Sequence, residues 1–151
     1  MITDKQLEPL KKIANKEQAA IITFIATDKA VRINPASYGT ASISTSDSYR
    51  LEAQVDAHCK GVKKAILLIH SPGGSLTSSY NIARFIRGRF EQLHVFVPYE
   101  AASGATLISL AGDKITLGDL GYLTPIDPQV LYEGMWISSY AIVEQVSDLE
   151  R

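Results

Sequence analysis

The chain has 151 residues, of which 46% are hydrophobic and 21% are charged, so it is long enough for one domain with a buried core. Its net charge of −1 gives no electrostatic reason to expect binding to nucleic acid or to an anionic membrane surface. The single cysteine, Cys59, excludes an intrachain disulfide framework and favours a reducing compartment.

The first 60 residues predict a helix, a strand and a second helix. Residues 3–17 carry apolar side chains at spacings of three and four, which is typical of an amphipathic helix. Residues 19–26 predict a buried, isoleucine-rich strand, and this run is far shorter than the roughly 20 residues of a membrane span. The charged first residues lack the apolar segment of a secretory signal. We therefore expect a cytoplasmic domain without a membrane span.

A loop rich in serine and threonine follows at residues 34–48. Ser46 or Ser48 is expected to cap the second helix, which is expected to end at Gly61.

The middle of the chain alternates strands and helices. Residues 65–70 are apolar without alternation, which predicts a strand covered on both faces. The SPGG loop follows, and then a helix with Tyr80, Ile82, Ala83 and Ile86 on one side. This order predicts an α/β domain with a largely parallel sheet.

Three further elements continue the pattern: a strand at residues 94–99, a helix at 103–112 and a short strand at 114–117. The tail contains YLTPIDPQV and then a last helix at 137–150. In parallel sheets the carboxyl ends of the strands carry the functional sites. The SPGG loop and the EAASG segment both lie at such ends.

Ser103 has two interpretations. A serine at the start of a helix can simply cap it, or it can be a nucleophile at the positive end of the helix. If the two loops reach the same edge of the sheet, the Ser103 hydroxyl faces the amides of Gly74 and Gly104. Acyl transfer requires this arrangement, because the amides can stabilise the developing oxyanion.

Three segments, IHSPGGSLTSSYNIARFI, VFVPYEAASGATLISLAGDKITL and LGYLTPIDPQ, resemble the Clp-peptidase/crotonase superfamily. The resemblance is nearest to the serine dehydrogenase proteinase family, a relative of signal peptide peptidase A. It covers residues 65–130 well and the first 60 residues loosely.

This resemblance implies a Clp/crotonase-like spiral of repeated β-β-α units with a mostly parallel sheet. It implies that Ser103 is the nucleophile and that the amides of Gly74 and Gly104 form the oxyanion hole. It also implies a homo-oligomer that acts on peptide or protein substrates. The whole of residues 1–151 is expected to be one such domain, with the site loops in residues 65–130.

The general base that a serine nucleophile requires is not evident. The Clp-type histidine position contains Asp127, and residues 115–150 contain no lysine, arginine or histidine. Lys114 is expected at the surface, and His70 and His94 are expected to be structural. We expect the base, by the resemblance a lysine, to lie beyond Arg151. The alternatives are that a neighbouring subunit supplies the base, or that the protein has lost catalysis.

No metal site or cofactor is predicted, because the histidines are scattered and the SPGGS loop lacks the GK[ST] of a phosphate-binding loop. Trp136 is expected in the core or at a subunit contact, and Cys59 as a packed residue rather than a reactive thiol.

The leading hypothesis is a serine peptidase. The others are a catalytically silent scaffold or peptide-binding module, and a crotonase-like acyl-CoA enzyme, against which the serine at the nucleophile position argues.

Overall fold

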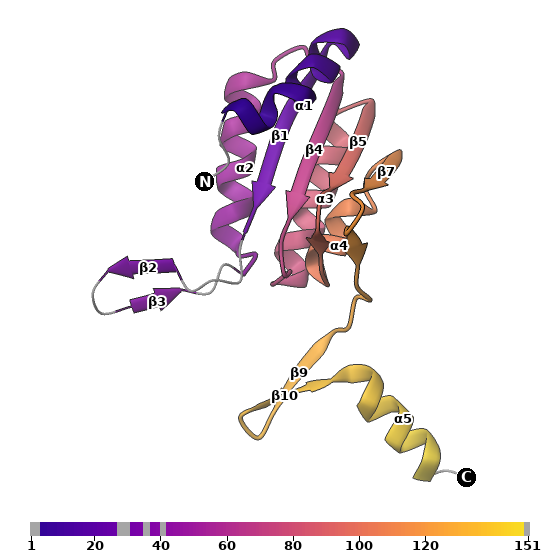
Figure 1. Cartoon of the computed structure of the whole chain (residues 1–151). Coiled ribbons are helices and arrows are strands. Elements are labelled where there is room, and N and C mark those ends of the chain that lie inside the picture. The colour runs from indigo at the N-terminus through magenta and orange to yellow at the C-terminus, as the bar shows by residue number, and fades with distance from the viewer. Residues whose placement is uncertain (1–3, 27–30, 35–36, 40–41, 150–151) are drawn as a thin grey trace.

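The computed structural model describes residues 4–26, 31–34, 37–39 and 42–149. Its centre is a parallel sheet with the strand order β1-β4-β5-β7 (Figure 1). These strands are Ala19–Ile25, Lys64–His70, Gln92–Val97 and Lys114–Leu117. Each lies within two residues of the strand that the sequence predicts. The α/β class with a mostly parallel sheet is therefore confirmed.

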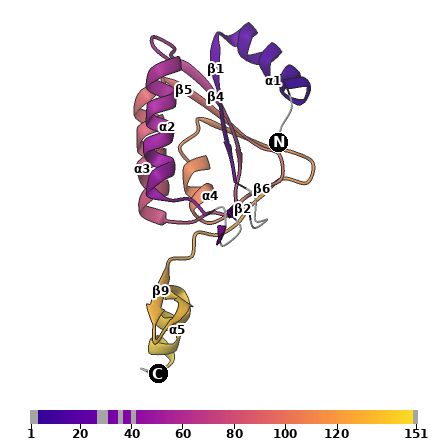
Figure 2. The same ribbon diagram turned by 90° about the vertical axis from the view of Figure 1, so that its left-hand side faces the viewer.

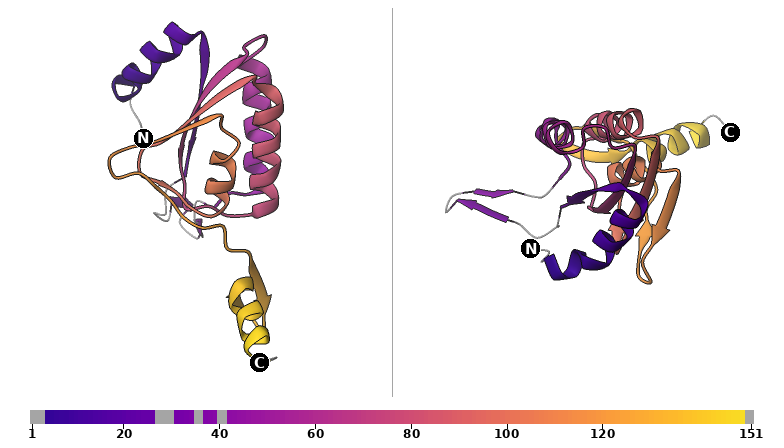
Figure 3. Two further views of the ribbon diagram at one scale, coloured as in Figure 1. Left: turned by 90° about the vertical axis from the view of Figure 1, so that its right-hand side faces the viewer. Right: turned by 90° about the horizontal axis from the view of Figure 1, so that it is seen from above.

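Helices cover the two faces of this sheet unequally. α2 (Thr45–His58), α3 (Leu76–Arg89) and α4 (Gly104–Ser109) lie on one face (Figure 2). α1 (Asp4–Glu17) lies on the other face, near the start of β1 (Figure 3). The core lies between the sheet and the helices α2, α3 and α4, where Leu67 and Ile69 of β4 are fully buried.

The apolar face of α3 differs from the prediction at one position. Ile82, Ala83 and Ile86 are buried as expected. Tyr80 is 52% exposed, and the Arg84 guanidinium lies over its ring. The small side chain of Ser79 takes the buried position instead, because α3 packs closely against α4 there.

The predicted cap of α2 was wrong. The N-cap is Ser44, whose backbone N–H donates to Asp47 Oδ2 at 2.8 Å and whose hydroxyl donates to the same oxygen at 2.7 Å. The helix ends at His58 rather than at Gly61. Ser44 prevails over Ser46 and Ser48 because it alone has an acidic residue three positions later.

Three pairs of short strands were not predicted. β2 (Val31–Asn34) and β3 (Ser37–Gly39) form a hairpin, part of which lies in the predicted loop. β6 (Glu100–Ala101) pairs in parallel with β8 (Tyr122–Leu123). β9 (Gln129–Tyr132) and β10 (Met135–Ser138) form a second hairpin. Its two-residue turn, Glu133–Gly134, has positive φ at both positions, as a type I′ turn requires.

β9, β10 and α5 (Ser139–Leu149) form a C-terminal arm that projects from the end of the sheet (Figures 1 and 2). α5 confirms the predicted last helix with slightly narrower bounds. The arm exposes many large apolar side chains: Val130, Leu131, Tyr132, Met135, Trp136, Tyr140, Ile142, Val143 and Val146. None of the helices in the described residues is long and apolar enough to cross a bilayer.

Candidate active site

The loops that follow β4 and β5 lie side by side at the carboxyl end of the sheet. The Ser71 N–H donates to the Glu100 carbonyl at 3.0 Å, and the Ala102 N–H donates to the Ser71 carbonyl at 3.0 Å. These two bonds hold the start of the SPGG loop against the segment that leads into Ser103. The Ser71 side chain is fully buried, and its hydroxyl accepts the Gly73 N–H at 3.1 Å.

Gly73 brings the SPGG backbone into direct contact with Ser103. Its φ is +96°, a conformation that favours glycine. A Cβ at this position would lie 2.5 Å from the Ala102 carbonyl oxygen and 3.0 Å from the Ser103 Cβ. No larger residue fits here without moving one of the two loops.

The side chain of Ser103 is not used as a helix cap. Ser103 occupies the N-cap position of α4, but its hydroxyl makes no capping hydrogen bond. Its backbone has φ +48° and ψ −112°, a region that is costly for a residue with a Cβ. The capping interpretation is therefore wrong for the side chain, and within the described residues the hydroxyl caps no backbone N–H.

A threonine pair holds the strained backbone of Ser103 in place. The Ser103 N–H donates to Thr124 Oγ1 at 2.8 Å. The Thr106 hydroxyl contacts two carbonyls, those of Ala101 at 2.7 Å and Thr124 at 2.8 Å. The start of α4 is thus fastened to the segment after β8. The sequence carries no signal for either threonine, because only the fold reveals their contacts.

Gly74 follows Gly73 in the SPGG loop, and Gly104 follows Ser103 at the start of α4. The Ile43 N–H donates to the Gly73 carbonyl, and the Ser75 N–H donates to the Ile43 carbonyl, each at 2.9 Å. The Gly74 N–H takes part in neither bond. Thr124 accepts the Ser103 N–H, whereas the N–H groups of Gly74 and Gly104 have no acceptor among the described residues.

A Cβ at Gly104 would collide with Ser79 Oγ and lie 3.3 Å from the Gly74 carbonyl oxygen. The two glycines therefore approach each other closely across the loops. The structure brings together Ser103, Gly74 and Gly104, the three residues that the sequence analysis selected.

Ser103 and Gly74 line one groove of about 910 Å³. The groove runs from the SPGG loop to the base of the C-terminal arm. Its lining residues are Ser42, Pro72, Gly73, Gly74, Ser75, Leu76, Thr77, Ser103, Asp127, Gln129 and Trp136. They include no lysine, arginine or histidine, so the lining residues provide no basic side chain beside Ser103.

Two of the possible bases lie at the wrong end of the sheet. Lys114 begins β7 and pairs with His94 near the start of β5, whereas Ser103 follows the far end of β5. His94 Nε2 is 2.9 Å from Thr116 Oγ1. Burial, together with the positive charge of Lys114, lowers the pKa of His94 against a smaller opposing effect of Glu17. His94 is therefore a structural residue of the sheet.

The other two histidines also stay out of the groove. His70 ends β4 at the correct end of the sheet, but its ring packs edge-on against Tyr99, with 6.1 Å between the ring centroids. Its Nδ1 is buried and has no hydrogen-bond partner among the described residues. His58 lies at the end of α2 and lines a different groove.

Asp127 and Trp136 both line the groove of Ser103. Asp127 Oδ1 accepts the Ser138 hydroxyl at 2.9 Å, so this carboxylate ties its loop to the arm. Trp136 is 67% exposed, so it is not in the core, and the expected subunit contact stays a prediction. Cys59 is a free, buried cysteine, and burial raises the pKa of its thiol despite the opposing charge of Arg89. The described residues contain no group of three side chains suited to hold a metal ion.

The fold and the neighbouring loops define a Clp/crotonase-like α/β protein with a serine at the start of a helix. The family model of ClpP-like SDH-type serine proteinases matches residues 1–148, and the chain belongs to this family. The resemblance predicted from the sequence motifs is thereby confirmed.

The curated relatives are archaeal. The Uncharacterized protein MJ0137 of Methanocaldococcus jannaschii is 32% identical over 128 residues, which cover 83% of this chain and 43% of that protein. The Uncharacterized protein MJ1495 of the same organism is 38% identical over 64 residues, which cover 42% of this chain and 22% of that protein. The chain thus spans less than half the length of these relatives.

Among solved structures, a mutant of the 1510-N membrane-bound stomatin-specific protease has the same fold. It superimposes with a TM-score of 0.57 and 16% sequence identity, over 85% of this chain and 57% of that chain. At this identity the likeness concerns the fold alone.

Proposed function

We propose that this chain carries the nucleophile and the oxyanion hole of a serine peptidase. The observation that carries the proposal is the Ser103 hydroxyl, which makes no capping bond and lies beside the SPGG loop. A strained serine with a free hydroxyl at a helix start is typical of an activated nucleophile. Family membership supports the same chemistry.

In this mechanism the Ser103 oxygen attacks the carbonyl carbon of the scissile peptide bond, and its proton passes to a general base. The carbonyl oxygen becomes an oxyanion that accepts hydrogen bonds from the Gly74 and Gly104 amides. Collapse of this intermediate breaks the C–N bond, and the base returns the proton to the leaving amine. Water then hydrolyses the ester on Ser103 by the same steps.

The base lies outside the described residues in this proposal. None of the described residues that line the groove has a basic side chain, and the relatives are more than twice as long as the region that this chain matches. A lysine from another part of a longer gene product, or from a neighbouring subunit of a homo-oligomer, would complete the site. The substrate is an extended segment of peptide or protein that lies along the SPGG loop and forms main-chain hydrogen bonds.

The second candidate function is a catalytically inactive peptide-binding module of the same fold. The lack of a basic residue in the groove lining favours it. Such a module needs the groove but gains nothing from a strained backbone at Ser103.

Covalent labelling by a fluorophosphonate distinguishes the two functions. The probe is applied to this chain, to its full gene product and to Ser103→Ala in each. Labelling of either protein that disappears in Ser103→Ala supports the peptidase, and labelling of the longer protein alone locates the base beyond Arg151. Folded proteins that both fail to react would refute the peptidase in favour of the binding module.

A further inference from the structure

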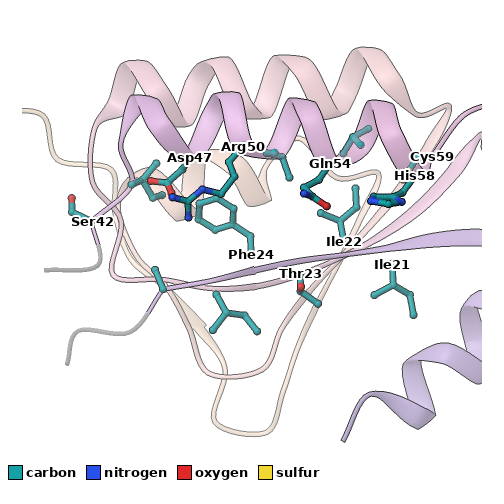
Figure 4. A pocket seen from close by; sticks show the side chains of 15 residues that line it. Ile21, Ile22, Thr23, Phe24, Ser42, Asp47, Arg50, Gln54, His58 and Cys59 are labelled. Atoms are coloured by element: carbon teal, nitrogen blue, oxygen red, sulfur yellow. The ribbon is translucent and has the colours of Figure 1, made fainter. Parts of the chain in front are cut away.

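A second groove lies between α2 and the outer edge of β1, away from Ser103. Its volume is about 510 Å³ (Figure 4). One wall consists of residues 21–26, which are most of β1 and the residue after it, and the other wall is α2. The described side chains of the Ser103 groove and of this groove share only Ser42, so the two grooves are separate features.

The β1 wall of this groove is the free edge of the sheet. β1 pairs with β4 on one side, and no strand in the described residues pairs with its other side. The Ala26 N–H donates to the His70 carbonyl at 2.8 Å, so it points toward β4. Because N–H groups alternate in direction along a strand, those of Ile21, Thr23 and Ile25 point to the free edge.

This edge lacks several of the features that normally prevent strand pairing. Ala19–Ile25 is a seven-residue strand, AAIITFI, without a proline or a charged residue. Natural proteins usually shorten, charge or cover such an edge. A long, uncharged edge with an open groove between it and the helix is suited to accept an added strand.

The α2 wall provides side-chain contacts for such a strand. Ile22 and Phe24 point from β1 toward α2, and Arg50, Gln54 and His58 point from α2 toward the edge (Figure 4). These three α2 residues are four positions apart and therefore share one face of the helix.

Two charged side chains line this otherwise mostly apolar groove. Asp47 Oδ2 accepts the N–H and the hydroxyl of Ser44, whereas Arg50 has no ion-pair partner among the described residues and can bind an acidic group.

The position of α2 limits what can occupy the groove. In the front view α2 lies beside β1, on the side away from β4 (Figure 1). A second copy that paired through its own β1 would bring a second overhanging α2 to the same place. A single extended segment has no such layer and fits beside β1 under the helix.

We propose that the β1 edge is a docking site for an extended peptide segment of a partner protein. The segment adds a fifth strand to the sheet through the amides of Ile21, Thr23 and Ile25. It has apolar side chains at alternate positions, which pack on Ile22 and Phe24, and an acidic side chain that pairs with Arg50. Docking is independent of the reaction at Ser103.

Fluorescence anisotropy with a labelled eight-residue peptide tests this site in the full chain. The peptide alternates valine with threonine and contains one glutamate, and two further versions carry N-methyl groups on one or the other alternate set of amides. Only one edge of the peptide faces β1, so we expect one methylated version to bind at least about tenfold more weakly and the other to bind normally. Equal binding of both versions would overturn the proposal, as would no binding at millimolar peptide.

Variants of the protein provide a second test. Thr23→Pro removes an outward N–H without affecting the ladder to β4, and we expect at least about a tenfold loss of affinity, whereas Thr23→Val keeps the wild-type affinity. Arg50→Glu weakens binding, while Arg84→Glu on the neighbouring helix is the matched control. If Thr23→Pro fails to fold, Arg50→Glu and the methylated peptides still decide the question.

Hydrogen exchange identifies the occupant. Bound peptide is expected to protect the amides of Ile21, Thr23 and Ile25, in the wild type and in Ser103→Ala alike. If these amides become protected without peptide as the protein concentration rises, a second copy occupies the edge and the proposal is wrong. If binding is lost in Ser103→Ala, the peptide occupies the other groove and the proposal is also wrong.

Discussion

At the scale of single residues, the site depends on a few positions where the backbone itself is crowded. Gly73 has a positive φ, and the Ala102 carbonyl oxygen lies only 2.5 Å from the position that a Cβ would take. Gly88, near the end of α3, has nothing within 4 Å of its Cβ position and no such backbone requirement. The same substitution therefore has opposite effects at the two glycines.

Gly73→Ala is expected to lower the free energy of unfolding by about 2–4 kcal/mol, because it combines a disfavoured φ with a main-chain collision. Gly88→Ala is expected to raise it by about 0.5 kcal/mol, because alanine favours the helix and restricts the unfolded chain. Urea denaturation of the two variants measures both changes. A Gly73→Ala protein as stable as the wild type would contradict the close approach of the SPGG loop to Ser103.

Thr124 is a positioning residue for Ser103, because its hydroxyl accepts the Ser103 N–H. Thr124→Val leaves this amide without an acceptor, so the strained serine relaxes, and the amide can compete for the oxyanion position. We expect fluorophosphonate labelling of the active form to slow by about tenfold. Thr124→Ser retains the hydroxyl and should restore the rate. Equal rates for valine and serine at this position would show that the bond does not position Ser103.

At the scale of elements, sequence patterns predicted the buried strands well and the exposed ones poorly. The apolar run in β4 is covered on both faces, and Leu93, Val95 and Val97 of β5 are buried. β1 differs from the expected buried strand, because it lies at the edge of the sheet and only its Ile22 is buried. β9 and β10 are equally apolar but exposed, so they have no alternation that would mark a strand. The Glu133–Gly134 dipeptide between them was the available hairpin signal.

Helix caps were predictable in principle. Ser44, Ser46 and Ser48 have the same local propensity, and only the reach of Asp47 back to the Ser44 N–H separates them. The Thr124 contact was not predictable, because it joins residues 21 positions apart in the chain. The candidate site residues were predicted from two loops at strand ends and from the motif resemblance, whereas only the fold shows the groove that contains Ser103 and Gly74.

One carboxylate joins α3 to the β5–β7 region and gives stability a pH dependence. Asp113 Oδ2 accepts the Arg87 guanidinium and the Leu93 N–H, each at 2.7 Å. The bond from Arg87, with that from Leu93, lowers the pKa of Asp113. A lowered folded-state pKa stabilises the protein above the unfolded pKa of about 3.9, and this stabilisation is lost as the pH falls through the folded value.

Asp113→Asn is therefore expected to lower the melting temperature at pH 7. The difference from the wild type should diminish below about pH 4, because the wild-type carboxylate is then protonated as well. Thermal unfolding followed by circular dichroism from pH 2.5 to 7 measures both curves. Asp119→Asn, at an exposed position, is the control. A difference that stays constant over this range would show that the charge of Asp113 contributes nothing.

At the scale of the whole molecule, the domain has a well-packed core and an arm whose apolar surface is uncovered. α5 exposes Tyr140, Val143 and Val146, which recur every three residues along the helix. Contiguous apolar surface of this kind marks an interaction site. The arm also supplies Gln129 and Trp136 to the Ser103 groove, so whatever orders the arm also shapes that groove.

The proposed homo-oligomer assigns a role to this surface. If a second copy covers α5, Val143→Glu combined with Val146→Glu places two charges in the contact. Burying one valine contributes about 1.5 kcal/mol or more, so losing both weakens assembly by roughly a hundredfold or more. Light scattering after size exclusion should then report a smaller mass than for the wild type. Leu120→Glu, at an exposed apolar residue outside the arm, should leave the mass unchanged. An equal mass for the double variant would mean that the arm does not hold copies together, and the proposed oligomer would need a different surface.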